Sequence, residues 1–432
     1  MKPAHRIALT TVVSLVCAQL SFADPKASPH LVARATYDTL LGMNGAEIIS
    51  VRHTDGIAAL TNVAGSVDVL DLSNPLAPRL LCRVAVNTAA GTPNSVAIHP
   101  HHDYFLVVTG TAGVVGTVQA YRVSSDPARC GSFLASAAVG IEPDSIAIAP
   151  NGKYAVIANE AEGRPPISPA ATGDAGGAGS LSLVDLTPFH DVIAGQLAVT
   201  NIPLSIPSSI VGLSTGRTDD LARLPINNTP ATIEPESVAF SHNSRYAYVT
   251  LQENNAVVRL EARTQELTFF GLGQTTHAAD LTVNNLYQPV QVLTAFREPD
   301  GIALDKTGRF FVTADEGDTR TGSGAAGTRG GRTLSVFEAD TGVLIGDTGG
   351  QIDDAAAAAG LYPDSRSNRG GSEPEGVDLA HHRGVTLAAV TLERANAVAL
   401  VDVSDPASPT VIDVEQVGTG PEGVKFFRVG PR

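Results

Sequence analysis

The sequence contains no tryptophan, and aromatic residues make up only 5% of its 432 residues. A large core must therefore be built from valine, isoleucine, leucine and alanine, which the hydrophobic content of 43% allows. Basic residues are also scarce, because 29 Lys and Arg face 44 Asp and Glu and give a net charge of −15. This balance argues against nucleic acid and anionic membrane surfaces as partners, and it favours cations or cationic partners.

Common catalytic and metal-binding signatures are also scarce. The sequence has no HExxH and no CxxC string, so it gives no sign of a zincin or of a thioredoxin-like redox site. A turn at residues 99–103 contains three histidines and Asp103, but its spacing matches no zinc motif, and we interpret it as a solvated turn. A GxGxxG string begins at Gly322, but no helical pattern follows it, so we interpret it as a loop.

Residues 1–23 have the features of a signal peptide. Lys2 and Arg6 form a positive start, residues 7–18 are largely apolar, and Ser21-Phe22-Ala23 is a small-x-small cleavage site. No other run approaches the roughly 18 apolar residues of a membrane span, so no membrane insertion is expected. We predict export to the periplasm or the medium, with cleavage after Ala23. Removing two positive charges takes the net charge from −15 to −17.

One strand-entry phrase recurs along the whole chain. Its seven copies are AEIISV from Ala46, PNSVAI from Pro93, PDSIAI from Pro143, PESVAF from Pro235, PDGIAL from Pro299, PEGVDL from Pro374 and PEGVKF from Pro421. Most copies are followed by a polar turn and a second β-rich strand, and repeats of about 45 residues without helical periodicity are typical of propeller blades. We therefore predict an all-β, seven-bladed β-propeller.

The last repeat is short, because only ten residues follow Glu422. We expect residues 30–41 to supply a partner strand, which leaves the last blade thin or closed by this N-terminal strand. Residues 24–432 are predicted to form a single propeller domain. Its long loops are expected at about 161–180, 187–233, 317–332 and 346–372. These insertions share the face of the strand entries, and the insertion-bearing face of a repeat protein is often its binding face.

Each strand entry carries one acidic or amide residue, and most second strands end on another. The entry residues are Glu47, Asn94, Asp144, Glu236, Asp300, Glu375 and Glu422. The residues at the ends of the second strands are Asn62, Glu160, Glu253, Glu316 and Glu393. Because the first strand of a blade lines the channel, these side chains should ring one channel mouth. Oxygen ligands of this type suit Ca²⁺ best, and another divalent cation is the alternative. We predict the ten carboxylates as metal ligands, although each alone can also fix a turn.

Two cysteines remain after the predicted cleavage, Cys82 and Cys130. Export permits a disulfide between them. Both are expected in outer strands of neighbouring blades, which splay apart beyond the Cα separation of about 7 Å that a bridge tolerates. The sequence therefore disfavours the bridge without excluding it, and it makes a cysteine nucleophile unlikely to lie at the channel.

Three strings resemble signatures of the choice-of-anchor I propeller family, which has YVTN-type repeats. They are VTLQENNAV from Val249, TADEGDTR from Thr313 and Ala158-Asn159-Glu160. The resemblance covers nearly all of the chain after residue 23. It implies an extracytoplasmic seven-bladed propeller, similar to mesenchyme-specific cell-surface glycoproteins and to members labelled alkaline phosphatase-like or linked to calcium mineral. Asp315 stands where the family pattern usually has Asn, and Ala161 replaces a Gly.

We expect the acidic, insertion-rich face to bind a divalent cation and to hold a protein or small-molecule ligand. Whether the protein is an enzyme stays open. A metal-dependent phosphoesterase is the alternative, with arginines near this face to hold an anion, although solvated loop charges explain them more simply. These arginines are Arg164, Arg320, Arg332 and Arg394. A lactonase-like hydrolase and a metal-free interaction scaffold are further alternatives.

Overall fold

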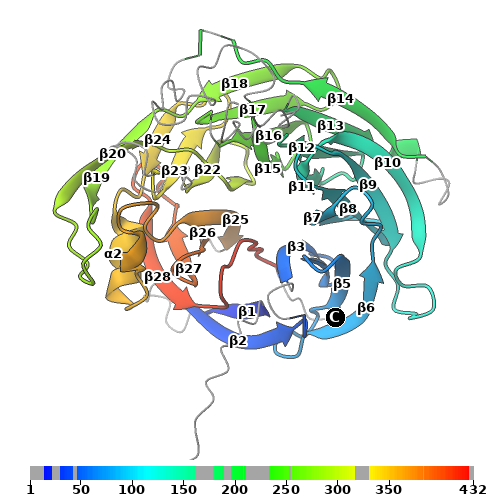
Figure 1. Cartoon of the computed structure of the whole chain (residues 1–432), viewed down its shortest axis with the longest axis horizontal. Helices are drawn as coiled ribbons and strands as arrows, with labels where there is room; N and C mark the ends of the chain where they lie inside the picture. The colour runs from blue at the N-terminus through cyan, green and yellow to red at the C-terminus, as the bar shows by residue number, and fades with distance from the viewer. Residues whose placement is uncertain are drawn as a thin grey trace, which may run out of the picture.

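The chain folds into a β-propeller around a central channel, as the computed structural model shows (Figure 1). The structure describes residues 14–21, 30–41, 46–161, 179–188, 196–207, 209–210, 233–252, 254–316, 330–382 and 384–427. Within these ranges, six four-stranded antiparallel sheets follow one another along the chain. The prediction of an all-β propeller is therefore confirmed.

The six blades share one plan, in which each strand pairs with the next one in sequence. Blade 1 is β3 (Ala46–Arg52), β4 (Ile57–Asn62), β5 (Ser66–Asp71) and β6 (Arg79–Ala85). Blade 2 is β7 (Thr92–Ile98), β8 (Tyr104–Gly110), β9 (Val115–Arg122) and β10 (Phe133–Ile141). Blade 3 is β11 (Pro143–Ile148), β12 (Tyr154–Asn159), β13 (Ser180–Asp185) and β14 (Ala198–Pro203).

The second half of the ring repeats this plan. Blade 4 is β15 (Pro235–Phe240), β16 (Tyr246–Leu251), β17 (Ala256–Glu261) and β18 (Leu267–Gly271). Blade 5 is β21 (Ile302–Leu304), β22 (Phe310–Asp315), β23 (Thr333–Glu338) and β24 (Leu344–Asp347). Blade 6 is β25 (Pro374–His382), β26 (Val385–Leu392), β27 (Ala397–Asp402) and β28 (Thr410–Gln416).

Shorter elements lie between the blades. A hairpin of β19 (Gln274–Ala279) and β20 (Gln291–Phe296) separates blades 4 and 5. The helix α2 (Gln351–Ala358) and the short 3-10 helix η3 (Asp364–Arg366) follow blade 5. The alanine-rich segment of the 346–372 insertion is thus helical, as its composition suggests. The predicted loop at 187–233 is not a loop throughout, because β14, the outer strand of blade 3, lies within it. The rest of that segment and the predicted loops at 161–180 and 317–332 lie largely outside the described residues.

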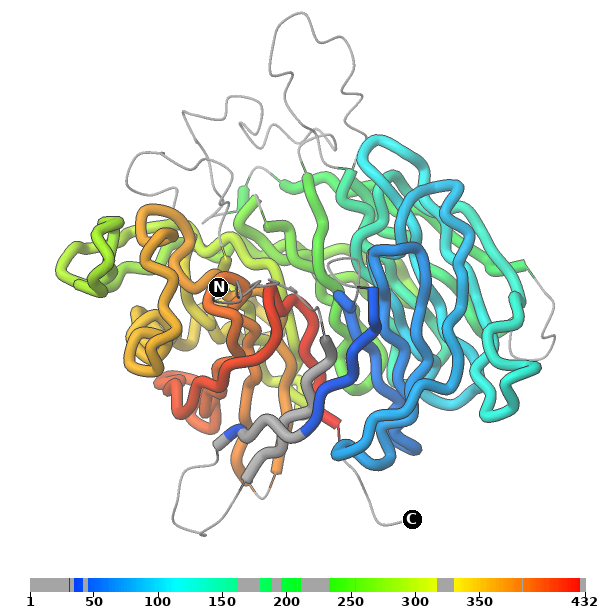
Figure 2. The backbone as a smooth tube through the Cα atoms, turned by 60° about the horizontal axis from the view of Figure 1, so that its bottom comes forward, coloured from blue at the N-terminus to red at the C-terminus, as the bar shows by residue number. Residues whose placement is uncertain are grey.

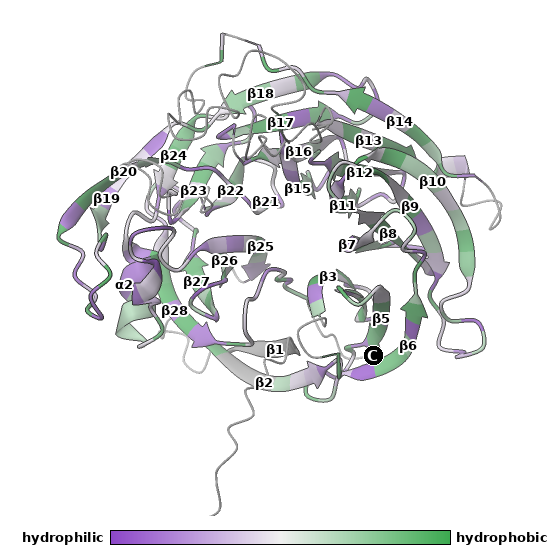
Figure 3. Cartoon of the chain, in the orientation of Figure 1, coloured by the Kyte–Doolittle hydropathy of each residue, from purple (hydrophilic) through white to green (hydrophobic). Residues whose placement is uncertain are grey.

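The core lies between neighbouring blades and is aliphatic, as the absence of tryptophan requires. Val156 of blade 3 and Val249 of blade 4 are both fully buried in one such cluster. The hydropathy colouring of Figure 3 shows the same preference for apolar residues along the strands. In β8 every residue is buried, because a strand in the middle of a blade is covered on both faces by adjacent blades.

The prediction of seven blades is wrong, because the seventh repeat does not form a sheet. Residues 421–427 have no strand, although they run along the channel between blades 6 and 1 (Figures 1 and 2, red). Phe426 packs towards blade 6, and Phe427 packs towards blade 1. No second strand follows this segment along the described chain, so its backbone has no neighbour with which to build a ladder.

An N-terminal strand within residues 30–41 occupies the outer part of this seventh sector, but it does not pair with residues 421–427 as was expected. The strand β2 (His30–Asp38) contacts both flanking blades. The Leu31 amide donates to Asp413 Oδ2 at 2.6 Å, and the Tyr37 hydroxyl donates to Asp68 Oδ2 at 2.9 Å. The ring is thus closed by β2 and by residues 421–427 instead of by a complete blade.

The segment predicted as a signal peptide contains a strand in this structure. The strand β1 (Ser14–Ser21) pairs antiparallel with β2, from Ser14 opposite Asp38 to Ser21 opposite His30. Removal of residues 1–23 would leave β2 without this neighbour. The signal peptide itself stays a prediction. Among the described residues, no helix has the length and apolar character needed to span a bilayer.

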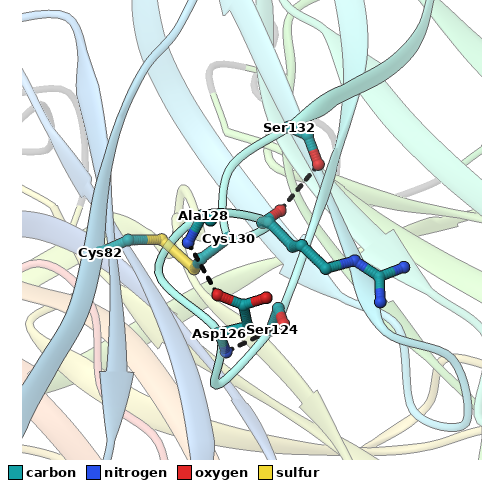
Figure 4. Close-up of a disulfide and its surroundings, with 7 residues drawn as sticks. Cys82, Ser124, Asp126, Ala128, Cys130 and Ser132 are labelled. Carbon is teal, nitrogen blue, oxygen red and sulfur yellow. Dashed lines mark hydrogen bonds between the residues drawn. A yellow bond between two sulfur atoms is a disulfide. The ribbon is translucent and has the colours of Figure 1, made fainter.

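Cys82 and Cys130 form a disulfide, which sequence reasoning disfavoured (Figure 4). Their Cα atoms are 6.2 Å apart. Cys82 lies on the outer strand β6, but Cys130 lies in the loop between β9 and β10 and not on a strand. The loop bends back on itself, with Cys130 N donating to Asp126 O, and it packs Cys130 against the blade 1 cluster around Val84. The splay of neighbouring blades therefore does not separate the two sulfurs.

Candidate functional site

A β-bulge turns the entry side chains into the channel. In five of the inner strands the pairing register shifts after the first or second residue. The shifts lie between Ala46 and Ile49, Pro93 and Ser95, Pro143 and Ser145, Pro235 and Val238, and Pro374 and Val377. A bulge sets two residues opposite one and re-aims the side chains at that point. The repeated proline-acid phrase is therefore the sequence signal of a bulge at the channel mouth.

The channel contains a cavity of about 890 Å³, a volume suited to a small-molecule ligand. Most of the predicted acidic and amide residues line it: Glu47, Asn94, Asp144, Glu160, Glu236, Asp300, Glu375 and Glu422. Glu316 and Glu393 join this set through direct contacts described below. Asn62 is buried and donates from Nδ2 to Ser66 Oγ at 3.2 Å, and Glu253 lies outside the described residues.

The densest group of acids joins blades 5 and 6, and we name it the four-carboxylate cluster. It consists of Glu316, Glu373, Glu375 and Glu393, each of which offers an oxygen within 4.8 Å of the others. Burial, followed by the charges of neighbouring carboxylates, raises the pKa of Glu316 and of Glu375 well above the usual glutamate range. The side chain of Glu375 hydrogen-bonds to Asp300 and Glu393. In the absence of a cation, these carboxyl groups therefore share protons at neutral pH. A bound cation would take the place of those protons.

A second group, the three-carboxylate cluster, joins blades 3 and 4. Asp144, Glu160 and Glu236 each offer an oxygen within 4.8 Å of the others. Burial, and then the charges of Asp300, Glu47 and Glu142, together raise the pKa of Asp144 to about 7. Clustered carboxylates at this spacing repel one another, so a proton or a cation lowers their free energy.

Glu47 and Glu422 form a third acidic contact, where blade 1 meets the C-terminal segment. Burial, and then the charge of Glu47, raises the pKa of Glu422 to about 8. Burial also raises the pKa of Glu47, while a hydrogen bond to Glu422 acts in the opposite direction. The seventh repeat thus forms no blade, but its acidic residue, Glu422, still lines the channel.

Sequence reasoning missed a second layer of glutamates, which directly precede the entry prolines. They are Glu142, Glu234, Glu298 and Glu373, and all are buried. Glu142, Glu298 and Glu373 have φ angles near +50°, a conformation that is rare outside glycine and further disfavoured before proline. The signal was available, since the string Glu-Pro-acid occurs four times in the chain.

The arginines near this face differ from the expected solvated loop charges. Arg332 is buried, pairs with Asp353 at 3.3 Å and donates to the Ser367 carbonyl. Arg394 is partly exposed and holds Glu373 Oε2 at 2.8 Å and Glu393 Oε1 at 2.7 Å. Arg394 is therefore part of the four-carboxylate cluster. Arg164 and Arg320 lie outside the described residues.

The histidine turn is not simply solvated, because His99 is fully buried. Its Nδ1 accepts from the amides of His101 and His102, so its Nε2 carries the proton and donates to the Gly152 carbonyl at 3.0 Å. His99 therefore joins two blades as a structural side chain. The glycine string from Gly322 lies outside the described residues. The expectation that the chain lacks a GxSxG string is wrong, because Gly212-Leu213-Ser214-Thr215-Gly216 has this spacing, and it too lies outside the described residues.

Together, fold and site define a β-propeller whose channel mouth is lined by clustered carboxylates. The chain matches the choice-of-anchor I domain model over residues 47–329 and 321–406. Because this match spans more than half of the chain, the protein belongs to the choice-of-anchor I domain family. The resemblance seen in the sequence is thereby confirmed.

Comparison with other proteins adds support for the fold alone. None of the curated proteins matches the sequence. A functionally unknown protein from Desulfotomaculum acetoxidans DSM 771 has a similar crystal structure, with a TM-score of 0.52, 11% identity and 91% of each chain covered. Kuenenia stuttgartiensis hydrazine synthase shares 12% identity over 86% of each chain, with a TM-score of 0.49.

Proposed function

We propose that the acidic channel mouth binds a divalent cation, Ca²⁺ foremost, in an exported propeller. The observation that carries the proposal is the four-carboxylate cluster, whose members each offer an oxygen within 4.8 Å of the others. Ca²⁺ accepts six to eight oxygen ligands with loose geometry, so four carboxylates and water can complete its shell. The ten carboxylates predicted from the sequence are the candidate ligands, and Glu373 joins them.

Electrostatics supports this proposal. Burial and the neighbouring carboxylates raise the pKa of Glu316 and of Glu375 well above the usual glutamate range, which favours their protonated forms in the absence of a cation. A bound cation provides the positive charge that these oxygens lack, so binding should release protons. The proton release per cation is a direct signature of carboxylates that were protonated before the ion entered.

Calorimetric titration of chelator-treated protein with Ca²⁺ and with Mg²⁺ tests the proposal. We expect a stoichiometric binding heat that depends on the ionisation enthalpy of the buffer, since protons are released. Glu316→Gln should weaken binding at least tenfold, whereas Glu266→Gln, an exposed turn residue on the outer side of blade 4, should leave it unchanged. Absence of binding heat together with an unchanged melting temperature would refute cation binding.

A metal-dependent phosphoesterase is the second candidate, and the position of Arg394 favours it. This guanidinium is 43% exposed beside the four-carboxylate cluster, where it could hold a phosphoryl oxygen next to a cation. Hydrolysis of p-nitrophenyl phosphate that requires the metal and is lost in Arg394→Met would support this activity. A cation-loaded protein without turnover on phosphomonoesters and phosphodiesters would exclude it for these substrates.

The disulfide supports the proposed location outside the cytoplasm. Disulfides persist in the periplasm and in the medium, whereas cytosolic thiols are kept reduced. Cys82 and Cys130 are paired here. Mass spectrometry of protein from the periplasmic fraction should find this bridge and an N-terminus at Asp24. A reduced pair or an intact N-terminus in the exported protein would contradict the corresponding part of the proposal.

A further inference from the structure

The channel wall has a second feature below its acidic mouth, a band of apolar side chains that we name the apolar collar. It consists of the residues four positions after the entry residue in blades 1 to 5: Val51, Ile98, Ile148, Phe240 and Leu304. All of them line the cavity of about 890 Å³ that also contains the entry carboxylates. Most of them stay partly exposed to it, and only Ile98 is buried.

The position of the collar follows from strand geometry. Residues four apart on an inner strand are about 10 Å apart along the channel, given a rise of about 3.3 Å per residue and one bulge. Further along, exposed His53, His101 and His242 line the other end of the same cavity. The channel therefore has a carboxylate mouth, a histidine-bearing mouth and, between them, a wall that is apolar on blades 1 to 5 and carries the Asp378–Lys425 ion pair on the remaining side.

Both features together specify a type of ligand. Water in the collar faces aliphatic and aromatic surface that it cannot hydrogen-bond, so an apolar group that replaces it gains free energy. The acidic mouth offers charge to a cationic group at one end of that ligand, and buried carboxylates become more favourable when a positive charge lies beside them. A cation without an apolar part would leave water in contact with the apolar collar.

We propose that the channel binds an elongated organic cation, with an ammonium head at the carboxylate mouth and a hydrocarbon body along the apolar collar. For its head the proposal rests on the cation-binding mouth proposed above, and for its body it rests on the collar alone. The head lies among Glu47, Asp144 and Glu375, and the body passes Ile148 and Phe240. An ammonium head and Ca²⁺ compete for the same carboxylates.

Alkylammonium ions of different length are suitable probes. An eight-carbon chain is about 10 Å long from C–C bonds of about 1.5 Å, which matches the distance from mouth to collar. In calorimetry on chelator-treated protein, below the aggregation concentration of the probe, n-octylammonium should bind about 10- to 200-fold more tightly than n-butylammonium, because four more methylenes are buried. Octanoate should bind at least tenfold more weakly than n-octylammonium. Equal affinity for octyl and butyl probes, or for octanoate and octylammonium, would overturn the proposal.

Matched phenylalanine variants locate the apolar contact. Phe240→Ser should reduce the octyl-to-butyl ratio at least fivefold while leaving Ca²⁺ binding unchanged. Phe133→Ser removes a 57% exposed phenylalanine from the outer strand β10 and should change neither. Leu304→Ala serves the same purpose if Phe240→Ser fails to fold. A fall in the ratio as large in Phe133→Ser as in the collar variants would count against the collar.

Failure of this proposal can be told apart from failure of the cation site. Ca²⁺ binding without any chain-length dependence of the alkylammonium probes would leave the metal site standing and remove the collar ligand. Chain-length dependence without Ca²⁺ binding would support the collar ligand and refute the metal site. Displacement of bound n-octylammonium by Ca²⁺ would place both at one mouth, whereas simultaneous binding would contradict the shared carboxylates.

Discussion

Replacing Asp144 by asparagine should alter the pH dependence of stability in the metal-free protein. Its carboxyl has a pKa of about 7 in the folded protein, against a reference value of 3.8, because burial disfavours its charge and Asp300 and Glu47 repel it. Between about pH 4 and pH 7 this carboxyl is therefore protonated in the folded protein and ionised in the unfolded chain. Stability from this group is fully present below about pH 4 and is lost as the pH rises through 7.

The magnitude follows from the size of the pKa shift. A difference of about three pKa units corresponds to about 4 kcal/mol at 1.36 kcal/mol per unit. The Asp144 side chain keeps some exposure to the water-accessible channel, and its titration is linked to that of the neighbouring carboxylates. Because solvent screening reduces the full value, we expect about 2 kcal/mol of stability to be lost between pH 4.5 and pH 8. The Asp144→Asn variant lacks this loss, so it should be more stable than the original protein at pH 8 and similar at pH 4.5.

Urea unfolding followed by far-ultraviolet circular dichroism, with chelator present, measures this effect from pH 4.5 to pH 8. The signal does not need tryptophan, which the protein lacks. Glu266→Gln is the control, because its carboxyl is exposed and should leave the pH profile unchanged. Ca²⁺ should flatten the profile of the original protein, since the ion replaces the proton. Parallel profiles for the original protein and Asp144→Asn would refute the reasoning.

Three further predictions concern the frame of the propeller. Replacing Cys82 and Cys130 by serine should lower the free energy of unfolding by about 4 kcal/mol for a sequence separation of 48 residues, measured in urea; an unchanged free energy of unfolding would contradict it. Arg297→Met removes the cation that pairs with buried Asp315 at 3.8 Å and with Asp347 at 2.8 Å, and it should cost about 3 kcal/mol in urea unfolding, part of it recovered by adding Asp315→Asn; no recovery in the double variant would contradict the role of Asp315. Tyr37→Phe removes the bond to Asp68 and should speed amide exchange in β2, with a cost of about 1 kcal/mol; unchanged exchange would argue against β2 as part of the closure.

The blades could be predicted because their signal is local. An entry proline, an acid and an alternating apolar run specify a strand with a bulge wherever a second strand follows. The prediction of seven blades failed at Pro421 for the same reason, since the entry phrase is present there but no partner strand follows it among the described residues. Six of the seven copies have a following strand within the described chain, and each of these six belongs to a four-stranded sheet.

The remaining features depend on long-range packing that sequence spacing does not encode. Cys130 reaches Cys82 because a loop of blade 2 folds back onto blade 1. Arg332 is buried because α2 places Asp353 beside it, which no local pattern around Arg332 reveals. Glu373 joins the four-carboxylate cluster because its backbone adopts a positive φ angle before a proline, against its local preference.

Blade 2 shows that the fold itself does not require acids at the channel mouth. It has Asn94 at the entry position and Gly110 at the end of the second strand, yet it forms the same bulge and the same four-stranded sheet as its neighbours. The amide of Asn94 donates to the Pro143 carbonyl at 2.8 Å, so a neutral side chain satisfies the turn. Carboxylates at the other entries instead raise one another's pKa, which costs free energy in the absence of a cation. Groups that a fold does not need and that are costly to bury mark a binding site more often than a structural turn.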